Sequence, residues 1–474
     1  MLEKFKPNII LILIDDLGGR DLGCYGSSFY ETPHLNRLAS DGMLFTNAYA
    51  SCPVCSPTRA SIMTGKYPAR IGVTQWIGGH AEGKLADVPY LHYLPQEEKS
   101  LASALKAEGY ASWHIGKWHL GDEEFYPDRH GFDINIGGCS WGCPRTFFSP
   151  YGIPTLDEGP AGEYLTDRLT DEAIRLICNR DSAPFFLNLW HYAVHTPIQA
   201  PEMLVEKYRR KAKMMKLDQI QPFIEGENFP CLHKQDQRVT RRMIQSDAAY
   251  AAMVENLDTN IGRVLQTLAT EGIADNTIVV FTSDNGGLST AEGAPTCNFP
   301  LSEGKGWNYE GGMRVCQMIR WPDKVAAGLR CDTPVTSTDF YPTFLEACGA
   351  QPMPDQHCDG ISLMPLFRGC KLDREAIFCH YPHYSNQGGA PAATIVEGDW
   401  KLIEFFEDGH LELYNLRNDL SETRNLLELD PSRADVLHQK LKAWQRSIEA
   451  KIPSANASYP RKLKRPTIAN NAHI

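Results

Sequence analysis

Three continuous runs of apolar residues do most to limit the folds that are open to this chain. They span residues 8–14, 184–190 and 277–282. A strand without alternation of apolar and polar residues is expected to be buried on both faces, as in the middle of a parallel sheet. Segments with helical periodicity, such as 165–177 and 247–265, separate the runs. Strands and helices that alternate over about 350 residues predict a mainly parallel sheet covered by helices on both faces.

The pattern changes after about residue 354. Strand-like segments, a turn and a helix-like segment then follow one another at 394–396, 400–406, 407–410, 411–414 and 436–448. We therefore expect a large α/β domain over residues 1–353 and a small antiparallel sheet with one helix over residues 354–474. A polar and basic stretch at 200–242 interrupts the first domain and is interpreted as a surface insertion with a solvated helix face.

The net charge of the chain and the length of its apolar segments limit the binding partners that we expect. The formal net charge is -11, which argues against nucleic acid or an acidic membrane surface as the main partner. No apolar run reaches the length of about 18 residues that a membrane-spanning helix needs. A small anionic substrate stays possible, because a basic pocket can lie within an acidic protein. The sequence does not indicate an oligomeric state.

The N-terminal residues and the cysteines indicate the compartment. The first seven residues lack the apolar core and small-residue cleavage site of a signal peptide. We therefore expect a cytoplasmic protein, or a secreted or periplasmic one if a leader has been removed. The 14 cysteines are scattered along the chain, as expected of reduced thiols rather than of a disulfide scaffold. The pairs Cys139/Cys143 and Cys52/Cys55 could bind a metal or act in redox chemistry, but no second pair completes a zinc site.

Polar side chains follow four of the expected strands, at the edge of the sheet where α/β proteins bind their ligands. These side chains are Asp15 and Asp16, Lys117 and His119, His195, and Asp284 and Asn285. Adjacent carboxylates at the end of a buried strand are unfavourable unless a cation compensates them. We therefore expect these groups to form one site.

The types of side chain indicate the chemistry of that site. Carboxylates and an amide are hard oxygen ligands that suit Ca²⁺ or Mg²⁺. Arg59, Lys117 and Lys305 can neutralise a tetrahedral dianion, and His119 and His195 can exchange protons near neutral pH. This combination predicts transfer or hydrolysis of a sulfate or phosphate ester.

One further segment, residues 55–65, contributes a thiol. Pro57 suits the first position of a helix and Gly65 suits its end, so Cys55 would lie just before a helix N-terminus. A helix N-terminus favours a nearby anion, and Arg59 adds a cation one turn later. The alternative interpretation is a buried free cysteine with no role in catalysis.

At this point the chain resembles the type I sulfatases, which are arylsulfatase-like, formylglycine-dependent enzymes of the alkaline phosphatase superfamily. The signature is Cys55-x-Pro57-x-Arg59, followed by Thr64-Gly65. Further motifs resemble those of the family in the same order, namely 14–16, 116–121, 283–287, 304–306 and the C-terminal segment 414–426. The resemblance implies an alkaline-phosphatase-like fold and is closest to microbial carbohydrate sulfatases.

The resemblance also implies roles for the residues. Cys55 would be converted to formylglycine by a maturation enzyme that reads the signature, and the hydrated aldehyde would attack sulfur. His195 would protonate the leaving alcohol, and His119 would assist the elimination that releases sulfate. The remaining assignments are Asp15, Asp16, Asp284 and Asn285 as calcium ligands, together with residue 55 itself, and Arg59, Lys117 and Lys305 as groups that bind the nucleophile and sulfate.

The leaving-group histidine and the substrate are less well determined. His191 lies four residues before His195, but the family pattern places the histidine directly before a Thr-Pro pair, which favours His195. The loops at 139–146 and 380–386 combine aromatic and polar residues, as sugar-binding pockets do. We expect His380, His383 and Asn386 to contact the substrate, although ordinary interdomain packing would explain these loops equally well.

The predicted reaction is exo-acting release of sulfate from a sulfated galactose or N-acetylgalactosamine unit, and a small aryl or steroid sulfate is the alternative substrate. Two other functions stay open at this point. A phosphatase or phosphodiesterase of the same superfamily would use a Ser or Thr nucleophile and a second metal. A non-catalytic glycan-binding relative would leave Cys55 unmodified, which is at odds with the intact Pro57 and Arg59.

Overall fold

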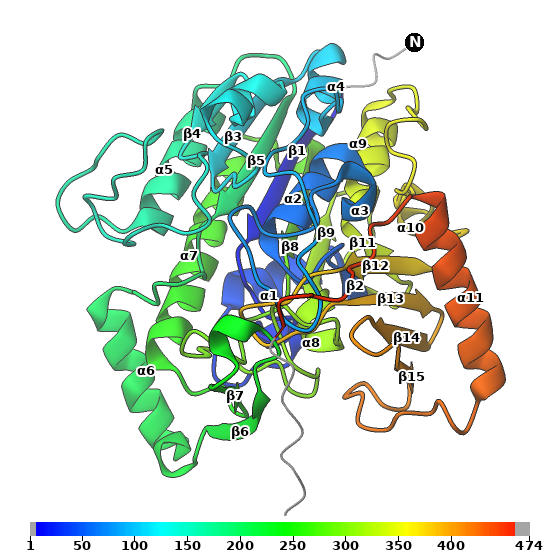
Figure 1. Ribbon diagram of the computed structural model, residues 1–474. Helices are drawn as coiled ribbons and strands as arrows, with labels where there is room; N and C mark the ends of the chain where they lie inside the picture. The colour runs from blue at the N-terminus through cyan, green and yellow to red at the C-terminus, as the bar shows by residue number, and fades with distance from the viewer. Residues whose placement is uncertain (1–5, 460–474) are drawn as a thin grey trace, which may run out of the picture.

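The computed structural model describes residues 6–459 (Figure 1). Its main element is a nine-stranded sheet with the order β10-β2-β9-β8-β1-β5-β3-β4, in which β11 also pairs with β2. The strands are β1 (Asn8–Ile14), β2 (Met43–Tyr49), β3 (Ala111–Gly116), β4 (Ile134–Ile136), β5 (Phe185–His191), β8 (Thr277–Ser283), β9 (Arg314–Arg320), β10 (Leu329–Cys331) and β11 (Val335–Thr336).

The sheet is mixed but mainly parallel, as the apolar runs predicted. Within this sheet, as described over residues 6–459, only β9 runs antiparallel to its neighbours, β2 and β8. The three predicted central strands are β1, β5 and β8, and they lie next to one another. Their register pairs Ile14 with His191 on one side and with Ser283 on the other. The three strands therefore end at the same level, and the residues that follow them meet at one edge.

Helices cover both faces of the sheet (Figure 1). Alternate residues of β1 face opposite sides. Ile10, Ile12 and Ile14 pack in the core formed with α1 (Pro33–Ser40), α5 (Leu165–Cys178) and α7 (Ala248–Thr270). On the other face, Leu11 and Leu13 pack in the core formed with α2 (Cys55–Thr64), α4 (Leu101–Ala107) and α9 (Phe340–Cys348). The shorter helices are α3 (Pro68–Ile71), α8 (Glu310–Met313) and α10 (Met364–Phe367).

A second, antiparallel sheet follows in the C-terminal part of the chain. It has the order β12-β13-β14-β15 and consists of β12 (Ile377–Tyr381), β13 (Ala392–Glu397), β14 (Trp400–Phe405) and β15 (Leu411–Asn415). Helix α11 (Pro431–Ser447) packs on this sheet through Leu437 and Leu441. The hairpin between β14 and β15 and the closing helix agree with the sequence prediction. Strand β12 is an addition, because the sequence analysis interpreted residues from 380 onward as a loop.

The stretch 200–242 contains α6 (Glu202–Met214), which packs on α7 and is not wholly solvated, and a two-stranded sheet of β6 (Phe223–Asn228) and β7 (Arg238–Arg242).

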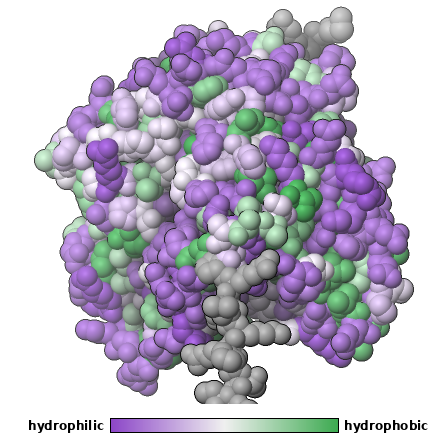
Figure 2. All heavy atoms as spheres, viewed as in Figure 1, coloured by the Kyte–Doolittle hydropathy of each residue, from purple (hydrophilic) through white to green (hydrophobic). Residues whose placement is uncertain are grey.

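Figure 2 shows that the face of the molecule drawn there is mainly hydrophilic, with scattered apolar residues. Among the described residues no helix is both long and apolar enough to cross a membrane. All 14 cysteines are free thiols.

Candidate active site

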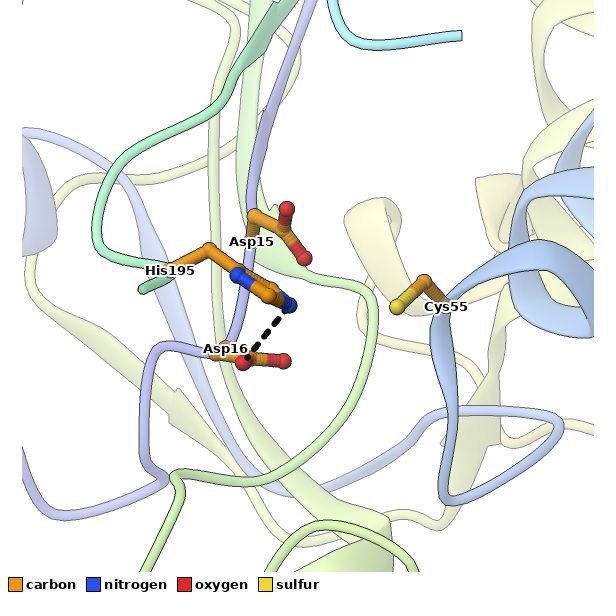
Figure 3. Close-up of side chains that lie close together, drawn as sticks. All are labelled: Asp15, Asp16, Cys55 and His195. Carbon is orange, nitrogen blue, oxygen red and sulfur yellow. Dashed lines mark ion pairs between the residues drawn. The ribbon is translucent and has the colours of Figure 1, made fainter. Parts of the chain in front are cut away.

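The polar residues that follow the central strands meet in one buried cluster (Figure 3). One ligand atom each of Asp15, Asp16, Cys55 and His195 lies within 4.8 Å of the others. Asp15 and Asp16 follow β1, and His195 lies in the loop after β5. Cys55 approaches from the opposite side, on the first turn of α2, and its side chain points toward the other three (Figure 3). The fold therefore joins the cysteine segment to the strand ends.

Helix α2 is buried along its whole length and differs in one detail from the prediction. It begins at Cys55 itself, so Pro57 is the third helical residue and not the first. Proline at this position still loses no hydrogen bond, because none of the first four N–H groups of a helix has an intrahelical partner. Gly65 ends the helix with φ 69°, in the left-handed region where glycine avoids the strain of a side chain.

Arg59 joins α2 to two of the strand ends. It is fully buried, and its Nε and Nη2 donate to Asp284 Oδ2 at 2.9 and 2.6 Å. Its Nη1 donates to the carbonyl oxygen of Lys117 at 3.0 Å. A guanidinium with fixed donors that is removed from solvent is a strong and specific anchor for a carboxylate. Arg59 therefore holds Asp284 in a fixed orientation below Cys55.

Two buried lysines neutralise the aspartates after β1. Lys117 Nζ lies 2.6 Å from Asp15 Oδ2, and Lys305 Nζ lies 2.8 Å from Asp16 Oδ2. Burial raises the pKa of Asp16, but the nearby charges of Lys305 and Lys117 and the hydrogen bond from Asn285 oppose this effect, and the pKa lies below its usual value. The carboxylate of Asp16 is therefore ionised at neutral pH, in a site where ion pairs are weakly screened.

Two oxygen atoms of the cluster lack a partner, which allows a test for a cation. Asp15 Oδ1 and Asn285 Oδ1 are buried and accept no hydrogen bond within residues 6–459. Asn285 Nδ2 donates to Asp16 Oδ1 at 2.8 Å, which assigns the free amide atom as oxygen. Buried polar atoms normally have partners, and unpaired hard oxygens are the ligands that a divalent cation takes. The donor set fits a bound metal ion.

The backbone at the site is strained in two places. Asp16 has φ 62° and His119 has φ 57°, both in the left-handed region, where a residue other than glycine costs about 1–2 kcal/mol. The loop after β1 is held by Asp21, whose Oδ2 accepts from the Gly18 N–H at 2.8 Å and from the Tyr250 hydroxyl at 2.5 Å. Sequence reasoning missed Asp21, because its role depends on Tyr250, which lies far away in the chain.

The structure separates the two candidate histidines. His195 Nε2 lies 2.9 Å from Lys305 Nζ and 3.5 Å from Asp16 Oδ2. Burial and the charge of Lys305 lower the pKa of His195 to about 4, so its imidazole is neutral at pH 7 and Nε2 accepts from Lys305. His191 is buried at the end of β5, and neither of its ring nitrogens has a hydrogen-bond partner in the described part of the chain. Only His195 belongs to the cluster.

His119 approaches from the loop after β3. Its Nε2 lies 3.0 Å from the carbonyl oxygen of Ile77 and therefore carries the proton, which leaves Nδ1 as the free acceptor. Burial lowers the pKa of His119 well below its usual value. Gly142 lies directly over this imidazole, since a Cβ atom at position 142 would be 2.7 Å from His119 Cε1. The loop at 139–146 therefore covers the site, as expected for one of its walls.

The cysteine itself is not a reactive thiolate. Burial raises the pKa of Cys55 to about 11, and the charges of Lys117 and Lys305 offset this only in part. A thiol with this pKa is almost entirely protonated at pH 7, and the protonated form is a poor nucleophile. The unmodified side chain of Cys55 is therefore poorly suited to attack a substrate.

The three residues expected at the rim have different surroundings. His380 lies within β12, and its Nε2 is bound to the carbonyl oxygen of Lys451 at 3.0 Å. His383 is buried and lies 2.8 Å from both Thr74 Oγ1 and Asp87 Oδ1. Both rings are therefore held by contacts within the protein, and their expected contact with the substrate stays a prediction. Asn386 alone lines a cavity.

Glu292 lies near the site and escaped the sequence analysis, and Cys143 was considered there only as a possible metal or redox pair with Cys139. Glu292 raises the pKa of Lys305, and the charges of Lys117 and Lys305 act on Cys143. Both residues lie in loops, and only the folding of these loops over the strand ends brings them to the site.

Comparisons with known proteins agree with this arrangement. The sulfatase family model matches residues 7–350, and the model described as N-sulphoglucosamine sulphohydrolase, C-terminal, matches residues 303–450. A sulfatase of Formosa agariphila is 32% identical, over 93% of this chain and 88% of its own. The N-acetylgalactosamine-6-sulfatase of Homo sapiens is 33% identical, over 78% of this chain and 68% of its own.

Among solved structures, Ps i-CgsB in complex with k-i-k-neocarrahexaose has a TM-score of 0.75 and 29% identity, with 95% of this chain and 94% of that chain covered. The similarity therefore extends over both sheets and includes the segments that carry the cluster. With this coverage by the family model and by the relatives, the chain belongs to the sulfatase family and is a sulfuric ester hydrolase.

Proposed function

We propose that this enzyme releases sulfate from a sulfated saccharide, with a galactose or N-acetylgalactosamine sulfate as the expected unit. The observation that carries this proposal is the position of Cys55, at the start of α2 and surrounded by buried aspartates and lysines. Two similar proteins have a saccharide in their names: a human N-acetylgalactosamine-6-sulfatase, and a solved structure in complex with a neocarrahexaose. Small aryl or steroid sulfates are the alternative substrates.

Residue 55 is proposed to act after conversion to formylglycine by a separate maturation enzyme that recognises Cys55, Pro57 and Arg59. A formylglycine supplies a hydrated aldehyde oxygen as the nucleophile toward sulfur. The high pKa of the unmodified thiol supports this assignment, because the thiol would be protonated at neutral pH. Lys117 and Lys305 provide positive charge that acts on residue 55, where a sulfate group would carry its negative oxygens.

His195 is proposed to donate the proton to the leaving alcohol. Its Nε2 faces Lys305 Nζ, so in the free enzyme the lysine occupies the position that the substrate oxygen would take. A bound sulfate attracts Lys305 and adds negative charge, and both changes favour the imidazolium. His119 Nδ1 has no hydrogen-bond partner within the described residues, and we propose that it assists the release of sulfate by accepting a proton from residue 55.

A divalent cation completes the proposed site, and the hard oxygen ligands favour Ca²⁺, with Mg²⁺ as the alternative. Asp15, Asp16, Asp284, Asn285 and residue 55 would hold it. The ion supplies positive charge that offsets the negative charge developing on the sulfate in the transition state.

Removal of the metal should lower activity and stability together. We expect a chelator to reduce kcat by at least about 100-fold, as the loss of several kcal/mol of charge stabilisation implies. The melting temperature should also fall, because the aspartates would lose a ligand that binds only the native state. Added Ca²⁺ should restore both quantities. Full activity after dialysis against chelator, with the metal content checked by mass spectrometry, would contradict the proposal.

The role of His195 predicts a dependence on the leaving group. His195→Ala should lower kcat by about 10²–10⁴-fold for a sugar sulfate, whose alcohol is a poor leaving group. For an aryl sulfate with an acidic phenol the loss should be much smaller, because the phenolate can leave without a proton. His191→Ala provides the comparison. If this variant alone abolished turnover of the sugar sulfate in folded protein, the assignment of His195 would be wrong.

Measurement of released sulfate tests the proposed function directly. Ion chromatography should detect sulfate from monosaccharide and disaccharide sulfates of galactose or N-acetylgalactosamine, and the same panel should include an aryl sulfate, a steroid sulfate and a phosphate monoester. A higher kcat/KM for the aryl or steroid sulfate would favour the alternative substrate. A higher kcat/KM for the phosphate ester would reject the proposal.

A further inference from the structure

A cavity of about 350 Å³ lies beside the catalytic residues and is not used in the mechanism above. We call it the Trp76 cavity. The 76–82 loop forms one wall, the short helix η5 (Leu232–Lys234) forms a second, and Asn386 contributes a third. Its volume is within the usual range of ligand sites, about 300–1,000 Å³.

Two contacts connect the Trp76 cavity to the active site. Ile77, which lies between the lining residues Trp76 and Gly78, accepts the hydrogen bond from His119 Nε2 at 3.0 Å. On another wall, Asn386 follows Ser385, and a Cβ atom at Gly306 would lie only 1.9 Å from Ser385 Oγ. Gly306 in turn follows Lys305. The walls of the cavity are therefore in contact with residues on two sides of the sulfate site.

The lining of the cavity favours an uncharged, hydroxyl-rich ligand. Trp76 is partly exposed and lines the cavity, while the rest of its ring packs against Gly79, where a Cβ atom would lie 2.7 Å away, and against the apolar cluster that contains Val54. Asn386 Oδ1 is buried and has no hydrogen-bond partner in the described residues. His80 and His233 add polar ring atoms. An aromatic face combined with hydrogen-bonding groups is the usual composition of a site for a sugar ring.

The charges argue against a second sulfate at this position. Glu82 is the acidic residue that lines the cavity, and the lining residues within the described part of the chain include no lysine or arginine. Lys234 of η5 lies nearby, but its Nζ already donates to the carbonyl oxygen of Asn386. A carboxylate would repel an anionic group but can accept hydrogen bonds from hydroxyls. The sulfated ring therefore belongs at Lys117 and Lys305, and a neutral ring belongs here.

Helix η5 lies in the inserted stretch 200–242, which is fastened to the other two walls. The Leu232 N–H donates to the carbonyl oxygen of Glu82 at 2.7 Å, and Lys234 Nζ donates to the carbonyl oxygen of Asn386 at 2.8 Å. Both acceptors are backbone carbonyl oxygens, so neither bond uses the side chain of Glu82 or Asn386. The insertion therefore closes the cavity and leaves the side chain of Asn386 free for a ligand.

From these observations we propose that the Trp76 cavity binds an uncharged sugar ring adjacent to the sulfated one, so that the preferred substrate is an oligosaccharide. The inference rests on the proposed function, because it assigns the alcohol part of the same sulfate ester. Trp76 would stack on the neutral ring, and Asn386 would accept a hydrogen bond from one of its hydroxyls.

Kinetics on substrates of different length test the inference. Trp76→Ala and Asn386→Ala should each lower kcat/KM by about 10- to 100-fold for a sulfated disaccharide, mainly through KM. For the corresponding monosaccharide sulfate the change should be less than about twofold. Trp76→Phe should recover most of the activity on the disaccharide, because it keeps an aromatic face. Asn418→Ala, at an exposed turn, is the matched control and should leave both substrates unaffected.

A binding measurement separates this inference from the proposed function. Wild-type protein should bind the same disaccharide without its sulfate in isothermal titration calorimetry, and Trp76→Ala should weaken that binding at least tenfold. This result would support the cavity even if no saccharide released sulfate. Equal losses on the disaccharide and monosaccharide, or equal binding of the unsulfated disaccharide by wild type and Trp76→Ala, would overturn the inference.

Discussion

Replacement of Cys55 by alanine should abolish sulfate release, with a fall in kcat of about 10⁴- to 10⁶-fold. This is the range observed when an enzyme loses its nucleophile but keeps its binding site. The surrounding charges would stay in place, because Arg59, Lys117 and Lys305 are held by Asp284, Asp15 and Asp16 and not by the cysteine. The variant should therefore remain folded, with an unchanged circular dichroism spectrum, and should still bind substrate.

Mass spectrometry of the peptide that contains Cys55 should show why the loss is so large. In active protein this peptide should be lighter than the encoded one by about 18 Da, the change for conversion of cysteine to formylglycine. Cys348→Ala is the control for the removal of a buried thiol. Cys348 lies in α9, and within the described residues its thiol donates to the carbonyl oxygen of Leu345. An unmodified Cys55 thiol in fully active protein would contradict the proposed nucleophile.

The centre of the site could be predicted from the sequence because the three central strands are mostly apolar and polar residues follow each of them. The change from Ile14 to Asp15, and from Ser283 to Asp284, marks where a strand leaves the core. Parallel pairing then brings these ends together without further information, as the register of β1 with β5 and β8 shows. The same argument locates His195, which follows β5 directly.

The rim could not be predicted in this way, because its residues are placed by packing between distant segments. His380 and His383 resemble residues of a polar loop, yet His380 lies in β12, which pairs with β13, and His383 is buried against Thr74 and Asp87. A histidine in a strand and one in a binding loop look alike when only their neighbours in the chain are known. Glu292 was missed for the opposite reason, since nothing near it in sequence indicates that it approaches Lys305.

A second prediction with a large effect concerns the contact between the two sheets. Lys401 of β14 is almost fully buried and lies 3.0 Å from Glu310 Oε1 and 2.8 Å from Glu422 Oε1. Glu310 begins α8 in the α/β part and is also bound by Arg314 Nε at 2.6 Å. The C-terminal sheet is therefore attached through a buried group of two carboxylates and two cations.

Replacement of Lys401 by methionine should lower the free energy of unfolding by about 3–5 kcal/mol. Removal of one partner from a buried ion pair leaves an uncompensated charge. Because this charge stays buried, water cannot solvate it and replace the lost attraction. Lys440→Met is the matched control, because Lys440 also contacts two glutamates, Glu397 and Glu375, at 2.6 and 2.8 Å, but near the surface. Its loss should be about 1 kcal/mol or less. Urea denaturation of both variants measures the difference.

The effect of Lys401→Met should also depend on pH in a direction that the structure determines. Burial raises the pKa of Glu422 to about 7, even though Lys401 opposes this shift. The native protein therefore binds more protons than the unfolded chain between about pH 4.5 and 7, and stability falls as the pH rises through this range. Without Lys401 the pKa of Glu422 would be higher still, so the destabilisation should be smaller at pH 5 than at pH 8. Adding Glu422→Gln, which keeps this position neutral, should recover part of the loss at pH 8. A loss that is equal at both pH values and unaffected by Glu422→Gln would mean that lost packing, and not buried charge, causes the destabilisation.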